Sequence, residues 1–201
     1  MNCEYFNTCG SCTLTMSYEE QLDFKHKREL DRFKDLYQGD MDLIQSEPEH
    51  FRNRAEFRIF HLDGTISYAM NDINKKFLCI NSCAIVSPSI YDLMPKLLDA
   101  VKEDELLSKR FFSVEFLSPL AGKTLVTMIY HRKLDSIWEE KAKELEKKLN
   151  IYIIGRSKKQ KVVLTKDSIE EKLPINNDTY NMGYQEGSFT QPNTKANIKK
   201  Y

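Results

Sequence analysis

Residues 51–61 have the sequence FRNRAEFRIFH, in which polar and apolar side chains alternate. This alternation predicts a β-strand with one apolar and one charged face. The apolar face would carry Phe51, Ala55, Phe57 and Ile59, and the charged face Arg52, Arg54, Glu56 and Arg58. The planar fork of arginine suits phosphate groups and base edges. Arg58 is interpreted as a contact of that kind, whereas Arg52 and Arg54 fit equally a ladder of interstrand ion pairs with Glu56.

The stretches around this strand predict hairpins and helices. Asp63-Gly64 is a hairpin turn, so residues 65–70 should return beside the first strand. Further strands are expected at 111–117, 123–131, 151–155 and 162–164, short extended pieces at 173–175 and 179–182, and helices at 18–37, 88–101 and 135–149. The last helix should be capped by Asp135 and bury Ile137, Trp138, Ala142, Leu145 and Leu149. The prediction is an α+β fold, a largely antiparallel β-sheet with helices packed on one side and no complete Rossmann-like domain.

Composition limits the class of protein. The 201 residues include 30 basic and 30 acidic side chains, so the whole surface is not a footprint for a polyanion, although local basic stripes can still bind RNA. No apolar run reaches the length of a membrane span, and the first residues do not resemble a signal peptide. We therefore expect a soluble, cytoplasmic protein without membrane contact.

Five cysteines all lie at or before position 83. Cys3, Cys9 and Cys12 have the spacing C-x5-C-x2-C, and Cys79 or Cys83 could supply a fourth thiolate. Four thiolates suit either a tetrahedral zinc ion or a [4Fe–4S] cluster. The alternative is that these cysteines are buried thiols without a ligand.

The most basic run of the chain is RSKKQK at residues 156–161, between two short predicted strands. A basic hairpin tip can hold phosphate groups without discriminating between base sequences. A solubilising turn explains the same residues equally well.

Residues 188–193, SFTQPN, resemble the entry to the catalytic domain of the RNA uracil-C5 methyltransferases, and residues 51–61 resemble the first long strand of that family. Two further motifs, Tyr18-x-x-Gln21-Leu22 and residues 130–135 (YHRKLD), also fit. The resemblance is greatest to the family's tRNA-modifying members. It extends over the whole chain but covers only the first half of the family's architecture.

This resemblance implies functional roles for individual residues. Gln191 would hydrogen-bond S-adenosylmethionine, Phe112 would stack within the opened T-loop of tRNA, and His131 would contact RNA, whereas from the residues alone Phe112 could simply be core. Some family members, notably the ribosomal ones, hold an iron–sulfur cluster on C-x5-C-x2-C plus a distant cysteine, and Cys83 matches that distant position better than Cys79. Zinc is the less favoured metal.

The implied function is formation of 5-methyluridine in the T-loop, with the tRNA T-arm, or tmRNA, as partner of a monomeric enzyme. The alternatives are a ribosomal RNA (rRNA) uracil-C5 methyltransferase, which the cysteines favour, and a non-catalytic RNA-binding module. The family's reaction needs a cysteine nucleophile, a carboxylate base and a cofactor loop. No catalytic residue is identified in this chain, and its seven glycines form no such loop.

The expected organisation has three parts. Residues 1–16 form a cysteine-bearing segment, residues 17–182 an RNA-binding domain, and residues 183–201 a loop and the start of a methyltransferase domain. The chain is therefore expected to be the N-terminal part of a longer enzyme and inactive alone. An apolar surface including Ile198 should remain where the catalytic domain would pack.

Overall fold

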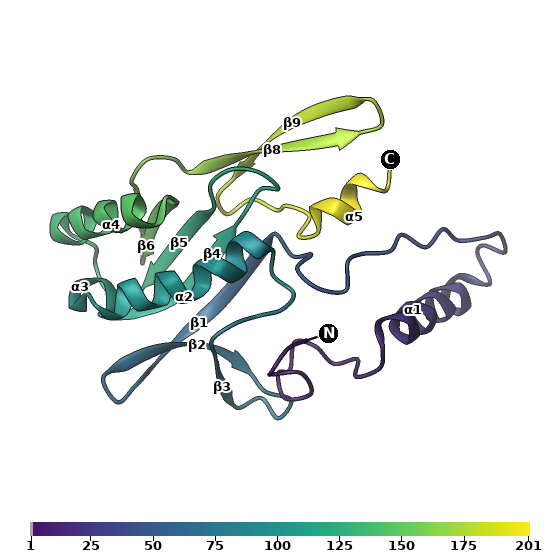
Figure 1. Cartoon of the computed structure of the whole chain (residues 1–201), viewed down its shortest axis with the longest axis horizontal. Helices are drawn as coiled ribbons and strands as arrows, with labels where there is room; N and C mark the ends of the chain where they lie inside the picture. The colour runs from purple at the N-terminus through teal and green to yellow at the C-terminus, as the bar shows by residue number, and fades with distance from the viewer. Residues whose placement is uncertain (1) are drawn as a thin grey trace.

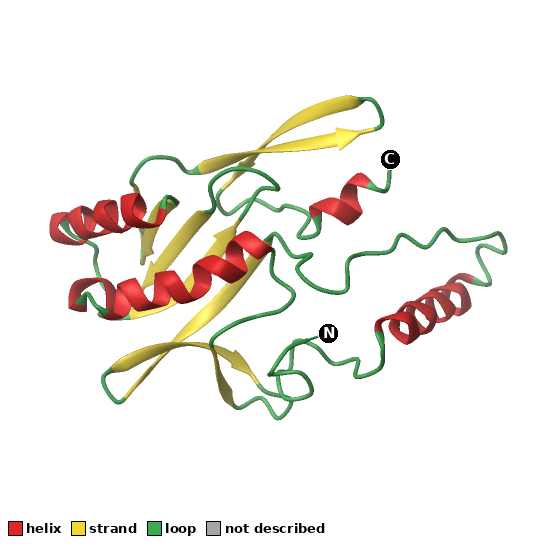
Figure 2. Cartoon of the chain, in the orientation of Figure 1, coloured by secondary structure: helices red, strands yellow, loops and turns green. Residues whose placement is uncertain are grey.

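A computed structural model describes residues 2–201 and contains a seven-stranded sheet in the order β3-β2-β1-β4-β5-β6-β7 (Figures 1 and 2). The strands are β1 (Arg54–Leu62), β2 (Thr65–Asn71), β3 (Phe77–Ile80), β4 (Phe111–Leu117), β5 (Leu125–Tyr130), β6 (Tyr152–Ser157) and β7 (Gln160–Val163). All neighbours are antiparallel except β5 and β6, which are parallel and joined through a helix. The predicted α+β class and largely antiparallel sheet are confirmed.

The helices are α1 (Tyr18–Phe33), α2 (Pro88–Lys102), α3 (Glu105–Ser108), α4 (Ser136–Leu149) and α5 (Thr194–Ile198). Helices α2 and α4 lie across one face of the sheet (Figure 2). Among residues 2–201, no helix has the length and apolar character needed to cross a membrane.

The main core lies between this helical layer and the sheet. The alternation of the first strand is confirmed, because Ala55, Phe57 and Ile59 are buried in the core. Tyr68 of β2 crosses the layer and donates a hydrogen bond to the carbonyl of Met94 on α2 (2.8 Å). Opposite α4, Gly155 leaves room for Trp138, since a Cβ atom there would lie 2.2 Å from Cη2 of the indole ring. The apolar face of the sheet is therefore closed by helices.

A β-bulge in β4 interrupts the alternation. Phe111 pairs with Tyr130 and Ser113 with Ile129, so Phe112 is the extra residue between two ladder positions. Phe111 and Val114 both enter the main core, although residues three apart on a regular strand point to opposite faces. Phe112 is therefore left outside that core.

The second face of the sheet is only partly covered. A separate hairpin of β8 (Ser168–Ile175) and β9 (Asp178–Gln185) packs through Ile169 against Leu125 and Ile154. This hairpin is longer than the two short pieces predicted from the sequence. It leaves the arginine-bearing part of β1 without an apolar cover.

Two helix predictions need correction. The first helix ends at Phe33, not Tyr37, and has no buried residue (Figure 1). In α4 the cap by Asp135 is confirmed, since its carboxylate accepts from the N–H of Trp138 (2.9 Å). However, Ile137 is 54% exposed. Neighbouring helical residues are about 100° apart, so Ile137 and Trp138 cannot both face the sheet.

Candidate functional site

Three predicted site residues form one stack on the second face of the sheet. The guanidinium carbon of Arg58 lies 4.7 Å from the ring centroid of Phe112, and the Phe112 and His131 rings are stacked with centroids 3.8 Å apart. The backbone N–H of His131 is fixed by the carbonyl of Arg110 (3.0 Å). Arg58 and His131 are exposed and Phe112 is half-buried. Exposed planar groups of this kind are surfaces on which unstacked bases can lie.

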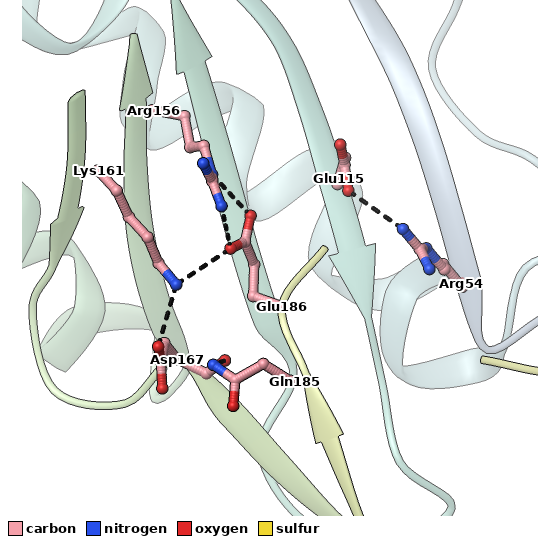
Figure 3. Close-up of polar contacts among 7 residues, drawn as sticks. All are labelled: Arg54, Glu115, Arg156, Lys161, Asp167, Gln185 and Glu186. Atoms are coloured by element: carbon pink, nitrogen blue, oxygen red, sulfur yellow. Dashed lines mark hydrogen bonds and ion pairs between the residues drawn. The ribbon is translucent and has the colours of Figure 1, made fainter. Parts of the chain in front are cut away.

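Arg52 and Arg54 are not part of this stack. Arg54 contacts Glu115 of β4 (3.6 Å) and donates to the carbonyl of Ser188 (2.7 Å), while Arg52 donates to the carbonyl of Arg54 (2.8 Å). The ion pair thus forms with Glu115 (Figure 3), whereas the ladder interpretation placed it on Glu56. Burial raises the pKa of Glu115, and the charge of Arg54 partly opposes that rise.

A buried carboxylate anchors the start of the loop at residues 186–193. Glu186, whose side chain is 6% exposed, accepts two hydrogen bonds from Arg156 of β6 (2.9 and 2.6 Å) and lies 3.3 Å from Lys161 of β7. Lys161 also pairs with Asp167 (3.0 Å) (Figure 3). The bidentate contact fixes both the position and the orientation of the carboxylate. It ties the end of β9 to the edge of the main sheet.

The other end of the same loop is also fixed. The carbonyl of Pro192 accepts from the N–H of Asn53 (2.6 Å), and the side chain of Asn193 donates to Ser46 Oγ (2.6 Å). Asn193 also caps α5 by accepting from the N–H of Ala196 (3.0 Å). Between these anchors Gln191 is exposed and Phe189 is 81% exposed. The loop therefore presents Gln191 to solvent from a fixed backbone.

The four cysteines of the predicted metal set line one cavity of about 410 Å³. Cys3, Cys9, Cys12 and Cys83 are free thiols on this cavity, whereas Cys79 is exposed and does not line it. Burial raises the pKa of Cys12 and of Cys83. Within the described residues, no group of three or more His, Cys, Asp or Glu side chains has the arrangement of a metal site.

Gly10 explains how the cysteine segment reaches the sheet. Its N–H donates to the carbonyl of Asn71 (2.9 Å), and a Cβ atom there would lie 2.8 Å from the carbonyl oxygen of Asp72. Any larger residue would push the segment away from the turn between β2 and β3. The glycine inside the C-x2-C motif thus sets the close approach of Cys9 and Cys12 to the domain.

The family model described as tRNA (Uracil-5-)-methyltransferase matches residues 17–201. The chain belongs to this family. It is 53% identical over 205 residues to a tRNA/tmRNA (uracil-C(5))-methyltransferase of Aliarcobacter butzleri, with 99% of this chain and 55% of the relative aligned. An enzyme of the same name from Nitratiruptor is 44% identical, with 99% and 54% aligned. The chain therefore spans about half the length of the curated relatives it matches.

A solved structure gives an independent comparison of the fold. Pyrococcus abyssi tRNA (uracil-54, C5)-methyltransferase, in complex with S-adenosyl-L-homocysteine, superposes with a TM-score of 0.66. The match covers 96% of this chain and 48% of that one, at 17% sequence identity. At this identity the likeness shows the fold alone, and it agrees with the α+β architecture described above.

Sequence patterns did not identify the acidic anchors Glu115 and Glu186. Each carboxylate meets a basic side chain that is distant along the chain, Arg54 and Arg156 respectively. In the sequence, each is visible only as one acidic residue on or after a predicted strand. Many solvent-exposed strands have such a residue, so it does not indicate an anchor. Only the pairing of the strands brings these charges together.

Replacing Glu186 by glutamine should lower the free energy of unfolding by about 1–3 kcal/mol at neutral pH, because the charge-assisted contacts to Arg156 are lost. The hydrogen bonds from Arg156 hold the pKa of Glu186 below its ordinary value. The stabilisation is thus complete above the unfolded-state pKa of glutamate, about 4.3, and is lost as the pH falls through the folded-state value. Denaturant unfolding of both proteins at pH 7 and at pH 3 measures this difference.

Glu170→Gln is the matched control, because Glu170 is an exposed residue of the adjacent strand β8. An equal loss in this control, or a loss for Glu186→Gln that does not shrink in acid, would contradict the anchor.

Proposed function

We propose that this chain is the RNA-binding part of an S-adenosylmethionine-dependent enzyme that forms 5-methyluridine in the T-loop of tRNA. The observation that carries the proposal is the stack of Arg58, Phe112 and His131 on the uncovered sheet face of a member of this family. The names of the two relatives, tRNA/tmRNA (uracil-C(5))-methyltransferases, support tRNA as the substrate. We expect tmRNA to be a second substrate. We expect the protein to act as a monomer in the cytoplasm.

In this proposal the stack holds an unpaired base. Removing a base from its own stack costs a few kcal/mol of free energy, and stacking on an aromatic side chain recovers about 1–3 kcal/mol of that cost. His131 presents the exposed ring, Phe112 supports that ring by stacking on it, and the guanidinium of Arg58 can reach a phosphate or a base edge beside them. Arg52 and Arg54, with their internal contacts, would support the strand and the neighbouring loop more than they contact RNA.

S-adenosylmethionine would supply the methyl group when bound. The donor set of the loop suits such a ligand, because Gln191 offers an exposed amide on a backbone fixed at both ends. We propose no nucleophile or general base within this chain. The division into residues 1–16, 17–182 and 183–201 remains our proposal, with the last part leading to the methyl-transferring domain and Ile198 on the surface that meets it.

The rRNA uracil-C5 methyltransferases remain a second candidate, because the four predicted cysteines share one cavity. We infer that Cys3, Cys9, Cys12 and Cys83 hold a [4Fe–4S] cluster, with zinc the less favoured ligand. The supporting observation is that Cys79, which the sequence left open as the fourth ligand, lies off the cavity.

The RNA proposal is tested by binding of a T-arm hairpin at fixed moderate salt. Arg58→Ala combined with Phe112→Ala should weaken binding about 10- to 100-fold, because a stacking surface and a cationic contact are removed together. Tyr91→Ala is the control, since Tyr91 lies on helix α2 on the opposite side of the sheet. Binding that is equally tight in the double variant would overturn the role of the stack.

The cysteine proposal is tested by metal content after anaerobic purification. Cys9→Ser should abolish bound iron and sulfide, together with the visible absorption of the cluster, whereas Cys79→Ser should leave both unchanged. Bound zinc in place of iron would show that the four cysteines form a zinc site and not an iron–sulfur cluster. Unchanged metal content in Cys9→Ser would refute the ligand assignment.

A further inference from the structure

A basic hollow lies beside the stack, between the end of β5 and the turn that joins β6 to β7. It has a volume of about 690 Å³, and its lining includes His131, Arg132, Lys133, Lys158, Lys159 and Gln160. None of the described residues that line it carries a carboxylate. We call this feature the basic hollow. The positive charge of its lining would attract anions.

The ion pairs of the sheet edge show which cations of the basic run are available. Arg156 and Lys161 are neutralised by Glu186 and Asp167. In contrast, Lys133, Lys158 and Lys159 are exposed, and within residues 2–201 none of them lies within 4.0 Å of a carboxylate oxygen. The basic run of residues 156–161 thus contains two ion-paired cations, Arg156 and Lys161, and two exposed lysines without a carboxylate partner among residues 2–201, Lys158 and Lys159.

The walls of the hollow are fixed before any ligand arrives. The guanidinium of Arg132 donates to the carbonyls of Leu106 (2.7 Å), Lys109 (3.1 Å) and Lys133 (3.2 Å). The amide of Gln160 accepts from the N–H of Leu134 (3.0 Å) and donates to its carbonyl (2.7 Å). These contacts lock the β6–β7 turn to the end of β5. A rigid site loses less conformational entropy when it binds.

We propose that the basic hollow binds the phosphodiester backbone of RNA next to the base held on the stack. His131 belongs to both features, because its ring stacks on Phe112 and also lines the hollow. A nucleotide whose base lies against the exposed side of the stack would place its flanking phosphates toward Lys133, Lys158 and Lys159, which line the same hollow as His131. These contacts position the strand and are independent of base sequence. The inference rests on the proposed function and adds a phosphate-binding site to it.

The test is the salt dependence of T-arm hairpin binding by the full chain. The variant is Lys158→Gln with Lys159→Asn, because Lys159 has a φ of 59° and asparagine tolerates this left-handed conformation. Removing two phosphate contacts should reduce the slope of log K against log salt by about 1.4–1.8. The control is Lys141→Gln with Lys143→Gln, since these lysines of α4 pair with Glu144 and Glu139.

A reduced slope in the turn variant, with the control unchanged and both proteins melting like the wild type, supports the site. Tight binding with an unchanged slope would overturn the site while the proposed function stands. A wild-type chain that fails to bind the hairpin would overturn both. A poly(A) strand of equal length separates the two roles further, because the turn variant should lose affinity for it as well.

Discussion

One-sided burial of the β-sheet is the constraint on which the rest of the structure depends. Helices α2 and α4 close one face over the apolar side chains of β1 and β4, so the alternating charges of those strands must face away from the core. The β8–β9 hairpin covers only the part of the second face near Leu125 and Ile154. The bulge at Phe112 then leaves an aromatic ring on the part that remains open.

Carboxylates divide the basic side chains of that open face into two groups. Glu115 pairs with Arg54, which donates to the carbonyl of Ser188, and Glu186 pairs with Arg156. Both pairs thereby fix the loop that presents Gln191. Arg58, Lys158 and Lys159 have no such partner among the described residues and face solvent. A neutral chain with 30 acidic and 30 basic residues can therefore still present a local cationic surface. The loop anchors and the proposed RNA contacts lie on one sheet face and use different residues.

Local signals predicted much of this architecture from the sequence. Periodicity placed the buried face of β1 and a helix at residues 88–101, one residue short of the observed end, and the cap at Asp135 was identified from residue type. The full length of β9 was missed although Tyr180, Met182 and Tyr184 alternate with polar residues, because almost the whole strand is exposed and this alternation marks no buried face. The clamp on Glu186 depends on contacts between residues 25 and 30 positions apart. No local pattern encodes such a pairing.

RNA is proposed to lie on the open part of the sheet face. The most direct measurement is photo-cross-linking of a T-arm hairpin carrying 5-iodouridine at the T-loop position, with the cross-linked peptides identified by mass spectrometry. Cross-links are expected at Phe112 and His131, whose rings stack on this face. Cross-links confined to helices α2 and α4, on the opposite side of the sheet, would contradict it.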